Sequence, residues 1–185
     1  MALLTARIRV FTLATALLLC AGVADAQPLV ASEDEVKAAF IYRFGSFVEW
    51  PPAAETTGPQ PFVIAVAGAG AIAEHLAQIT AQRTIDDRPV VVRRLERGDS
   101  FDAPDILFVG RDARRFLPAL IEGLHGAPTL VVSEFEDGIE RGSMIDLVVA
   151  DERVRFDVAP AAAEACGLKI SSRVLAIARR VVPAS

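Results

Sequence analysis

The sequence predicts an α/β fold: a single-domain α/β sandwich with a mostly parallel central sheet and an antiparallel hairpin at one edge. Short continuous apolar runs, typical of strands buried on both faces, alternate with helical segments through the middle of the chain. Two strand-like runs near the end, Met144–Ala150 and Arg153–Val158, face each other across a tight Asp151-Glu152 turn. The 185 residues suffice for one domain with a substantial core, and no internal repeat or second-domain boundary is found.

The N-terminal 26 residues have the pattern of a secretory signal peptide. Arg7 and Arg9 precede an apolar run that extends to about Leu19, and Ala24-Asp25-Ala26 matches an A-x-A cleavage site. The alternative is a membrane anchor, but the run is shorter than the ~20 residues that a spanning helix needs. We therefore expect a signal peptide over residues 1–26 and a mature α/β domain over residues 27–185, located in the periplasm.

The mature chain is acidic. Its 159 residues contain 17 basic and 23 acidic side chains, a net charge of −6, which argues against nucleic acid or an anionic membrane surface as a partner. Only Cys166 remains after cleavage, so no disulfide can form within the mature chain. We expect Cys166 to pack as a small apolar residue; a disulfide between two chains is the alternative.

The first helix of the mature chain is predicted to begin at a capping box, Ser32-Glu33-Asp34-Glu35. Apolar residues follow at helical spacing and predict one broad core-facing stripe, with Lys37, Arg43 and Ser46 off it. The stripe consists of Val36, Ala39, Phe40, Phe44, Phe47 and Val48. The helix should end at Glu49-Trp50, because a residue before proline avoids helical backbone angles. Trp50 is interpreted as a core residue, with a ligand platform as the alternative.

The middle of the chain supplies alternating strands and helices. The expected elements are strand Phe62–Ala67, helix Ala71–Ile79, strands Pro89–Leu95 and Asp105–Val109, helix Arg111–Leu124 and strand Pro128–Val132. Thr84–Arg88 is expected as an approach to the second strand, and residues 53–61 and 133–141 as loops. Pro118 should kink or split its helix near Leu117, because proline lacks the amide that continues a helix.

We expect the rest of the chain to pack on the stretch from Gly142 to Val182, which contains the hairpin and the final helix. Alternation along Arg153–Val158 predicts that Val154, Phe156 and Val158 face one side of the sheet. The same alternation places Arg153, Arg155 and Asp157 on the other side. A short Ala-rich helix should begin at Pro160 and be interrupted at Gly167, and a closing helix should begin at Ser171 or Ser172.

Motifs for catalysis or cofactor binding are weak. Gly68-x-Gly70-x-x-Ala73 has the form of a dinucleotide fingerprint, but export and the turn-like Asp86-Asp87 favour a tight strand-to-helix turn. His75 and His125 are far apart, and the acidic residues Glu134, Glu136, Asp137 and Glu140 lack the spacing of a calcium loop. Ser133, Ser143, Ser171 and Ser172 lie outside any G-x-S-x-G motif, and the last two are interpreted as helix caps. We expect no metal, no cofactor and no enzymatic activity.

Several segments together resemble the YfiR-like periplasmic regulators. They are Lys37-Ala38-Ala39-Phe40-Ile41-Tyr42 with Phe47-Val48-Glu49-Trp50-Pro51, then Phe62-Val63-Ile64 and Gly68, then Gly142-Ser143-Met144-Ile145 with Val154–Val158, and last Gly167–Leu175. The likeness covers nearly all of the mature chain in the expected order, and its first and last segments are the specific ones.

The resemblance implies a non-enzymatic role. Members that are understood bind the periplasmic sensor part of an inner-membrane diguanylate cyclase and hold it inactive, which lowers cyclic di-GMP and suppresses biofilm formation. They tend to dimerise, so a homodimer is expected. By motif position, the family's proposed small-ligand pocket falls on Asp157, Lys169 and Ser171. Partner contact is expected at the hairpin and final helix, on Phe156, Leu168 and Leu175.

The chain departs from some relatives. At two of the pocket positions some relatives carry Arg and His, where this chain has Lys169 and Ser171. Redox-responsive relatives carry cysteine pairs, one of which flanks the loop before the hairpin; this chain has Ile139 and Asp146 there, so we expect no intramolecular disulfide switch.

Residue chemistry alone leaves alternatives open. Asp157 and Lys169 would pair with each other, or offer opposite charges to a zwitterionic or phosphorylated ligand. A ligand-sensing protein that presents a small molecule to another membrane receptor, such as a histidine kinase, would share the same fold. An exported hydrolase that uses Ser171 or Asp157 is the third function class.

Overall fold

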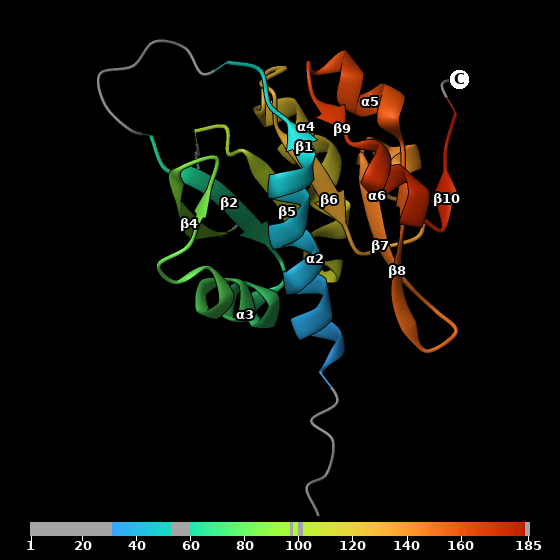
Figure 1. Cartoon of the computed structure of the whole chain (residues 1–185), viewed down its shortest axis with the longest axis horizontal. Coiled ribbons are helices and arrows are strands. Elements are labelled where there is room, and N and C mark those ends of the chain that lie inside the picture. Colours follow the sequence, from blue (N-terminus) through green and yellow to red (C-terminus); the bar gives the residue numbers. More distant parts are fainter. Residues whose placement is uncertain (1–30, 53–59, 97, 100–101, 184–185) are drawn as a thin grey trace, which may run out of the picture. The chain divides into compact units, whose positions relative to one another are not determined.

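The structure, a computed structural model shown in Figure 1, describes residues 31–52, 60–96, 98–99 and 102–183. The expected signal peptide lies outside the described residues. Residues from Ala31 onward form one compact unit. No helix in the described part of the chain is long and apolar enough to cross a membrane.

An eight-stranded sheet forms the centre of the fold, in the order β10-β8-β7-β6-β5-β2-β4-β3. Its strands are β2 (Phe62–Ala67), β3 (Thr84–Ile85), β4 (Arg88–Leu95), β5 (Ile106–Val109), β6 (Leu130–Ser133), β7 (Ile145–Ala150), β8 (Arg153–Val158) and β10 (Arg180–Val181). The five strands from β4 to β7 are parallel, and β8 returns antiparallel to β7. This confirms the predicted fold class. A separate antiparallel pair joins β1 (Val48–Glu49) to β9 (Lys169–Ile170).

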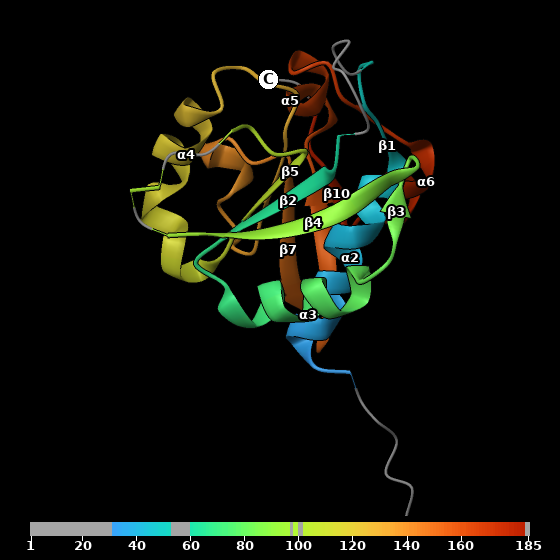
Figure 2. The same ribbon diagram turned by 90° about the vertical axis from the view of Figure 1, so that its left-hand side faces the viewer.

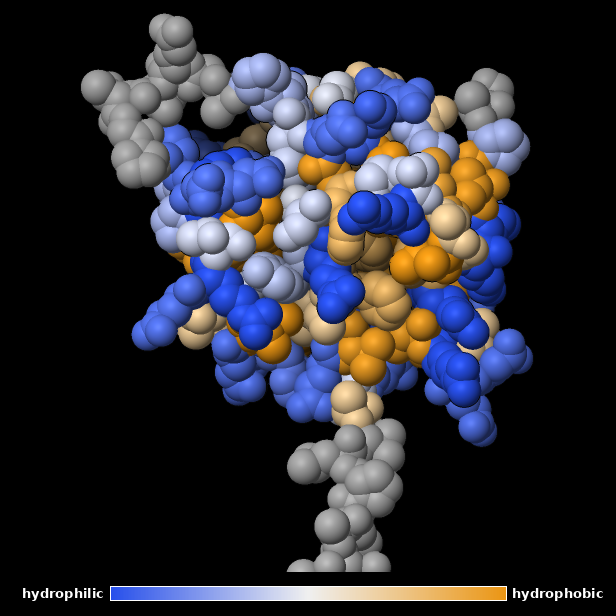
Figure 3. Space-filling view, in the orientation of Figure 1, coloured by the Kyte–Doolittle hydropathy of each residue, from blue (hydrophilic) through white to orange (hydrophobic). Residues whose placement is uncertain are grey.

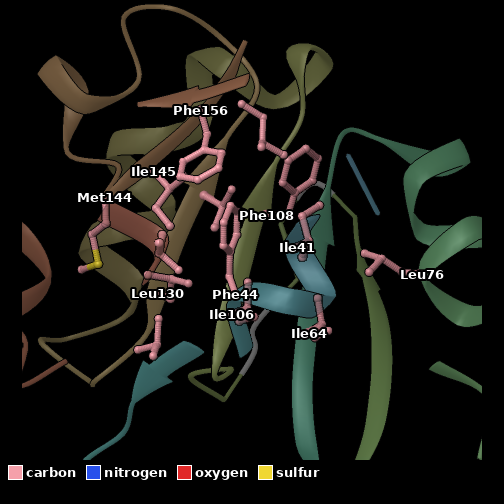
Figure 4. Packing of buried hydrophobic residues seen from close by; sticks show 14 of the residues in the cluster. Ile41, Phe44, Ile64, Leu76, Ile106, Phe108, Leu130, Met144, Ile145 and Phe156 are labelled. Atoms are coloured by element: carbon pink, nitrogen blue, oxygen red, sulfur yellow. The ribbon is translucent and has the colours of Figure 1, made fainter. Parts of the chain in front are cut away.

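Helices cover both faces of the sheet (Figure 2). The helices α2 (Glu33–Phe47), α3 (Gly70–Thr80), α5 (Pro160–Ala165) and α6 (Ser172–Ile177) pack on one face, and α4 (Leu117–Gly123) packs on the other after the 3-10 turn η1 (Arg111–Phe116). A short 3-10 turn, η2 (Ile139–Arg141), precedes β7. Alternate residues of β2, such as Ile64 and Ala65, enter the two different cores, as the two-residue period of a strand requires. Figure 4 shows the larger core, where Phe44, Phe108 and Phe156 lie close together.

The first helix begins as its sequence predicts. Ser32 Oγ accepts a hydrogen bond from the Glu35 amide at 3.2 Å, and the Glu35 carboxylate accepts one from the Ser32 amide at 2.6 Å. The helix ends earlier than predicted, at Phe47, because Val48 and Glu49 pair with β9. Trp50 packs as a core residue: its ring lies edge-on to Phe62 with centroids 5.2 Å apart, and its indole donates to the Gly45 carbonyl at 3.1 Å.

Prolines and tight turns set other boundaries. The predicted helix 111–124 is split at Leu117, as expected: a 3-10 turn ends at Phe116 and α4 begins at Leu117. Pro118 lies in the first turn of α4, where the amide that proline lacks would have no helical hydrogen-bond partner. Asp86 and Asp87 both have positive φ angles and form the turn between antiparallel strands β3 and β4. They therefore belong to a hairpin turn and not to a strand end that would hold a ribose, which supports the tight-turn interpretation of the Gly68 motif.

Candidate functional site

Asp157 lies in β8 and is almost fully buried. Its carboxylate accepts hydrogen bonds from Arg179 at 2.8 and 2.6 Å and from Arg180 at 3.0 Å. Burial by itself would raise the pKa of Asp157, but the hydrogen bonds and charges of the two arginines outweigh burial and hold that pKa below 3.8. Asp157 is buried, although the alternation grouped it with the exposed Arg153 and Arg155. It pairs with arginines, so of the two alternatives that the sequence left open, the pairing with Lys169 is not the one observed.

Lys169 lies on the surface in β9. Its ammonium is 3.0 and 3.2 Å from the two carboxylate oxygens of Glu49 in the paired strand β1. Both side chains are about two-thirds exposed, so this ion pair contributes at most about 1 kcal/mol to stability. Its charge therefore stays accessible to a ligand or partner.

Ser171 occupies the cap position of α6, but its side chain makes no capping hydrogen bond. Its Oγ is buried and has no hydrogen-bond partner among the described residues. A buried hydroxyl without a partner costs about 1–3 kcal/mol, so this atom would gain from a polar contact. Asp157, Lys169 and Ser171 thus engage three different surroundings, and their expected role in ligand binding remains a prediction.

The three apolar residues expected to contact a partner differ in exposure. Phe156 is 2% exposed and packs edge-on against Phe40 and Phe44, with ring centroids 5.5 and 5.2 Å away (Figure 4). Leu168 is also buried, whereas Leu175 is partly exposed. Phe156 and Leu168 are therefore core residues in this structure. The large apolar side chains that are exposed nearby are Ile177, at 64%, and Val181, at 44%.

Two separate pockets lie beside α2 and share Phe40 in their linings. The first has a volume of about 150 Å³ and is lined by Phe40, Arg43, Phe44, Phe47, Phe156, Arg173, Val174 and Ile177. The second has a volume of about 400 Å³ and is lined by Ala31, Glu33, Val36, Phe40, Val149, Glu152, Arg153 and Val154. Apolar side chains are visible on this face of the molecule among charged ones (Figure 3).

Lys37 is a buried charge that the helical pattern failed to identify, since the pattern placed it off the core stripe. Its ammonium is fully buried and lies 2.6 Å from Glu33 and 2.5 Å from Glu134. The other Glu134 oxygen accepts the Arg111 amide at 2.9 Å, and the hydrogen bond from Lys37 holds the pKa of Glu33 below its usual value. The cluster joins α2 to the segments that follow β5 and β6. The Glu33–Lys37 spacing of four residues is the one sequence signal for it.

Asp146 holds the segment between β6 and β7. Its carboxylate accepts hydrogen bonds from the Ser133 hydroxyl at 2.5 Å, from the Ile139 amide at 2.7 Å and from the Ser143 hydroxyl. Burial raises the pKa of Asp146, an effect that the three hydrogen bonds reduce but do not cancel. A Cβ atom at Gly138 would overlap both Ser133 and Asp146, so the segment closes tightly over this carboxylate.

Cys166 follows α5 with a free thiol. It is half-buried and packs against the larger core. This confirms the expected apolar packing; a disulfide between two chains is the alternative that a reducing agent would reveal.

Comparison with known proteins places these features in a family. The YfiR/HmsC-like family model matches residues 34–179. No curated protein matches the sequence. Among solved structures, the fold is similar to a conserved domain protein from Vibrio cholerae O1 biovar El Tor, with a TM-score of 0.57 and 16% identity. That alignment covers 82% of this chain and 60% of the Vibrio chain. The family match spans most of the described domain, and the chain belongs to the YfiR/HmsC-like family.

Proposed function

We propose that this chain is a periplasmic regulatory protein that inhibits an inner-membrane diguanylate cyclase by direct contact with the cyclase's periplasmic sensor part. The observation that carries the proposal is the family match over residues 34–179, since a regulatory role in cyclic di-GMP signalling is what this family implies. Lower cyclic di-GMP and weaker biofilm formation would follow from inhibition. The signal peptide over residues 1–26 would deliver the protein to the periplasm.

The C-terminal surface supports binding. Ile177 and Val181 expose apolar side chains near Arg173 and the half-exposed Arg179 and Arg180. A surface that combines exposed apolar side chains with arginines has the composition enriched at protein interfaces. Because Phe156 and Leu168 are buried, we assign the contact to Ile177 and Leu175. A homodimer in the free state is part of the proposal.

A small ligand would bind near the start of α6. Ser171 offers a hydroxyl without a partner, and Lys169 offers an accessible charge. Asp157 would take part only if a ligand displaced Arg179 or Arg180. Because this position adjoins the partner contact at Leu175 and Ile177, a bound ligand would change how the protein contacts the cyclase.

The experiment is a pull-down of the tagged mature chain from detergent-solubilised inner membrane. We expect recovery of a membrane protein with a cytoplasmic cyclase domain, and loss of that recovery with Ile177→Asp. Val91→Asp is the matched control, because Val91 is an exposed β-branched residue on β4, near the opposite edge of the sheet. Recovery of a histidine kinase instead would favour the ligand-presenting alternative. Equal recovery by both variants would contradict the assigned surface.

A further inference from the structure

The chain crosses from β4 to β5 without a helix. Both strands are parallel to β2 and lie on opposite sides of it, so residues 96–105 pass across the sheet. Connections between parallel strands usually contain a helix, but no described residue of this one is helical. Because such crossovers are right-handed, this connection belongs on the face opposite α3, the helix that joins β2 to β4. That face of β2 and β4 therefore has no crossover helix to cover it.

A cavity lies on this face, and we call it the crossover cavity. In Figure 2 the edge of the sheet at β4 faces the viewer, and α3 and α4 lie on different sides of it. The cavity has a volume of about 530 Å³, which exceeds that of either pocket beside α2. Its apolar walls come from the ends of β2 and β4, from η1 and from α4, and include Ala67, Leu95, Ala113, Phe116 and Leu120.

The cavity is an opening in the smaller core. All five of these side chains belong to that core or pack against it. Val91 lies on the same face of β4 as Leu95 and is 38% exposed, so the uncovered surface continues along the strand. Small-molecule sites in proteins measure about 300–1,000 Å³ and are mostly apolar with a few polar groups. The crossover cavity has the size and the lining of such a site.

Carboxylates supply the charge around the crossover cavity. Among its described lining residues, the charged side chains are Glu96, Asp99 and Asp112, and His125 is the one other residue that titrates near neutral pH. None of the three carboxylates forms an ion pair within the described part of the chain. Asp99 accepts the amide of Glu96 at 2.9 Å, which holds these two residues together at the end of β4.

Two exposed arginines lie near the cavity but are not among its lining residues. Arg93 shares a face of β4 with Leu95, and the guanidinium of Arg115 lies 4.8 Å from the centroid of the Phe116 ring. Exposed charges are screened by water and salt, so these arginines weaken the negative potential less than a lining cation would. The lining therefore favours a positively charged group.

We propose that the crossover cavity binds a small organic cation that consists of an aromatic body and one amine. The body would cover Leu95 and Leu120 and lie against the Phe116 ring, which removes apolar surface from water. The amine would donate a charge-assisted hydrogen bond to the carboxylate of Glu96 or Asp112 at the rim.

This site is independent of the proposed function. It lies on the face of the sheet that α4 covers in part, whereas α6, which follows Ser171, packs on the other face. A titration of the cavity needs no partner protein. Its failure would leave the capture of a cyclase unaffected, and failure to capture a cyclase would leave the cavity assignment unaffected.

Three matched aromatic probes test the proposal with the mature chain. They are naphthylethylamine, naphthylethanol and naphthylacetate, which are cationic, neutral and anionic at neutral pH. Titration followed by the NMR chemical shifts of backbone amides gives both the binding site and the dissociation constant. We expect naphthylethylamine to bind at least about threefold more tightly than naphthylethanol, and naphthylacetate to bind most weakly. The largest shifts should occur at the amides of Gly68, Leu95 and Leu120.

Three variants separate the roles of charge and volume. Glu96→Gln/Asp112→Asn keeps the size of two exposed side chains, so its melting temperature should stay nearly unchanged, and the amine and the alcohol should bind to it equally. Glu122→Gln is the matched control, because it removes an exposed carboxylate of α4 that does not line the cavity, and it should keep the preference for the amine. Leu120→Trp fills the cavity and should weaken the binding of all three probes about tenfold or more.

Several results would overturn the proposal. Equal affinity of the wild type for the amine and the alcohol, or tighter binding of naphthylacetate, would refute a cationic ligand. A preference for the amine that survives in Glu96→Gln/Asp112→Asn would do the same for the two carboxylates. No binding of any probe at millimolar concentration, or largest shifts around Ser171 instead of the cavity, would refute the site itself.

Discussion

Asp157→Asn tests the interaction that holds the C-terminal strand to the sheet. Arg179 and Arg180 reach Asp157 across 22 and 23 residues of chain, and their segment adds β10 to the edge of β8. The substitution keeps the shape of the side chain but removes its charge. Hydrogen bonds to charged groups contribute about 1.5–3 kcal/mol each, and the partial exposure of both arginines, 38% and 52%, reduces that value. We expect a total loss of about 2–3 kcal/mol.

A loss of that size lowers the melting temperature of a domain with about 150 residues by roughly 4–12 °C. Because the pKa of Asp157 is lower in the folded state, its contribution is fully present above the unfolded value of 3.8 and is lost as the pH falls through the lower folded value. The difference between variant and wild type should therefore be constant from about pH 5 to 8 and shrink below about pH 3.8. Urea unfolding followed by circular dichroism measures both quantities.

Asp151→Asn is the control, because Asp151 lies exposed in the turn of the same hairpin. We expect it to change the free energy of unfolding by less than about 0.5 kcal/mol. If Asp157→Asn were equally mild, or if its effect persisted undiminished at pH 3, the ion-pair explanation of the C-terminal strand would be refuted.

Three further predictions concern the neighbouring elements. Asp146→Asn should make the free energy of unfolding less dependent on pH. The pKa of Asp146 is raised in the folded state, so the wild type loses stability as the pH rises from 3.8 through the folded pKa, and the variant has no such group. Plots of unfolding free energy against pH that run parallel for the two proteins, measured in urea, would contradict this. Gly138→Ala should lower the free energy of unfolding by about 2–4 kcal/mol in the same assay, because the added Cβ displaces Asp146 from its hydrogen bonds. Gly70→Ala is the control: it lies at the start of α3 with open space around it, and it should leave the free energy of unfolding unchanged or raise it. A reducing agent should leave both the melting temperature and a captured partner complex unchanged, because the mature chain has only Cys166; release of the partner on reduction would show an inter-chain link.

The sequence was informative where local chemistry decides the structure. The capping box at Ser32, the buried parallel strands and the split at Leu117 follow from hydrogen bonding and backbone angles within a few residues. The two-residue strands β1, β9 and β10 were not predicted. Such short segments carry no periodicity, and they become strands only because a distant strand offers open backbone groups. The earlier end of α2 is a consequence of the same pairing.

The charged residues were the least predictable part of the candidate site. Alternation grouped Asp157 with Arg153 and Arg155, which are exposed, but Arg179 and Arg180 beyond the final helix pair with Asp157, which is buried. Helical spacing placed Lys37 off the core stripe. Its ammonium is nevertheless buried against Glu134, which follows β6 and lies 97 residues later in the chain. Both errors have one physical cause. A buried charge depends on a partner from another element, and no local pattern identifies that partner.

The most direct test measures cyclic di-GMP synthesis by the captured membrane protein itself. Right-side-out membrane vesicles with GTP enclosed would receive the mature chain on the outer, periplasmic face. We predict that synthesis falls as the wild-type chain is added, that Val91→Asp inhibits equally, and that Ile177→Asp does not inhibit. Unchanged synthesis at saturating wild-type chain would contradict the proposal that this protein inhibits a cyclase by direct contact.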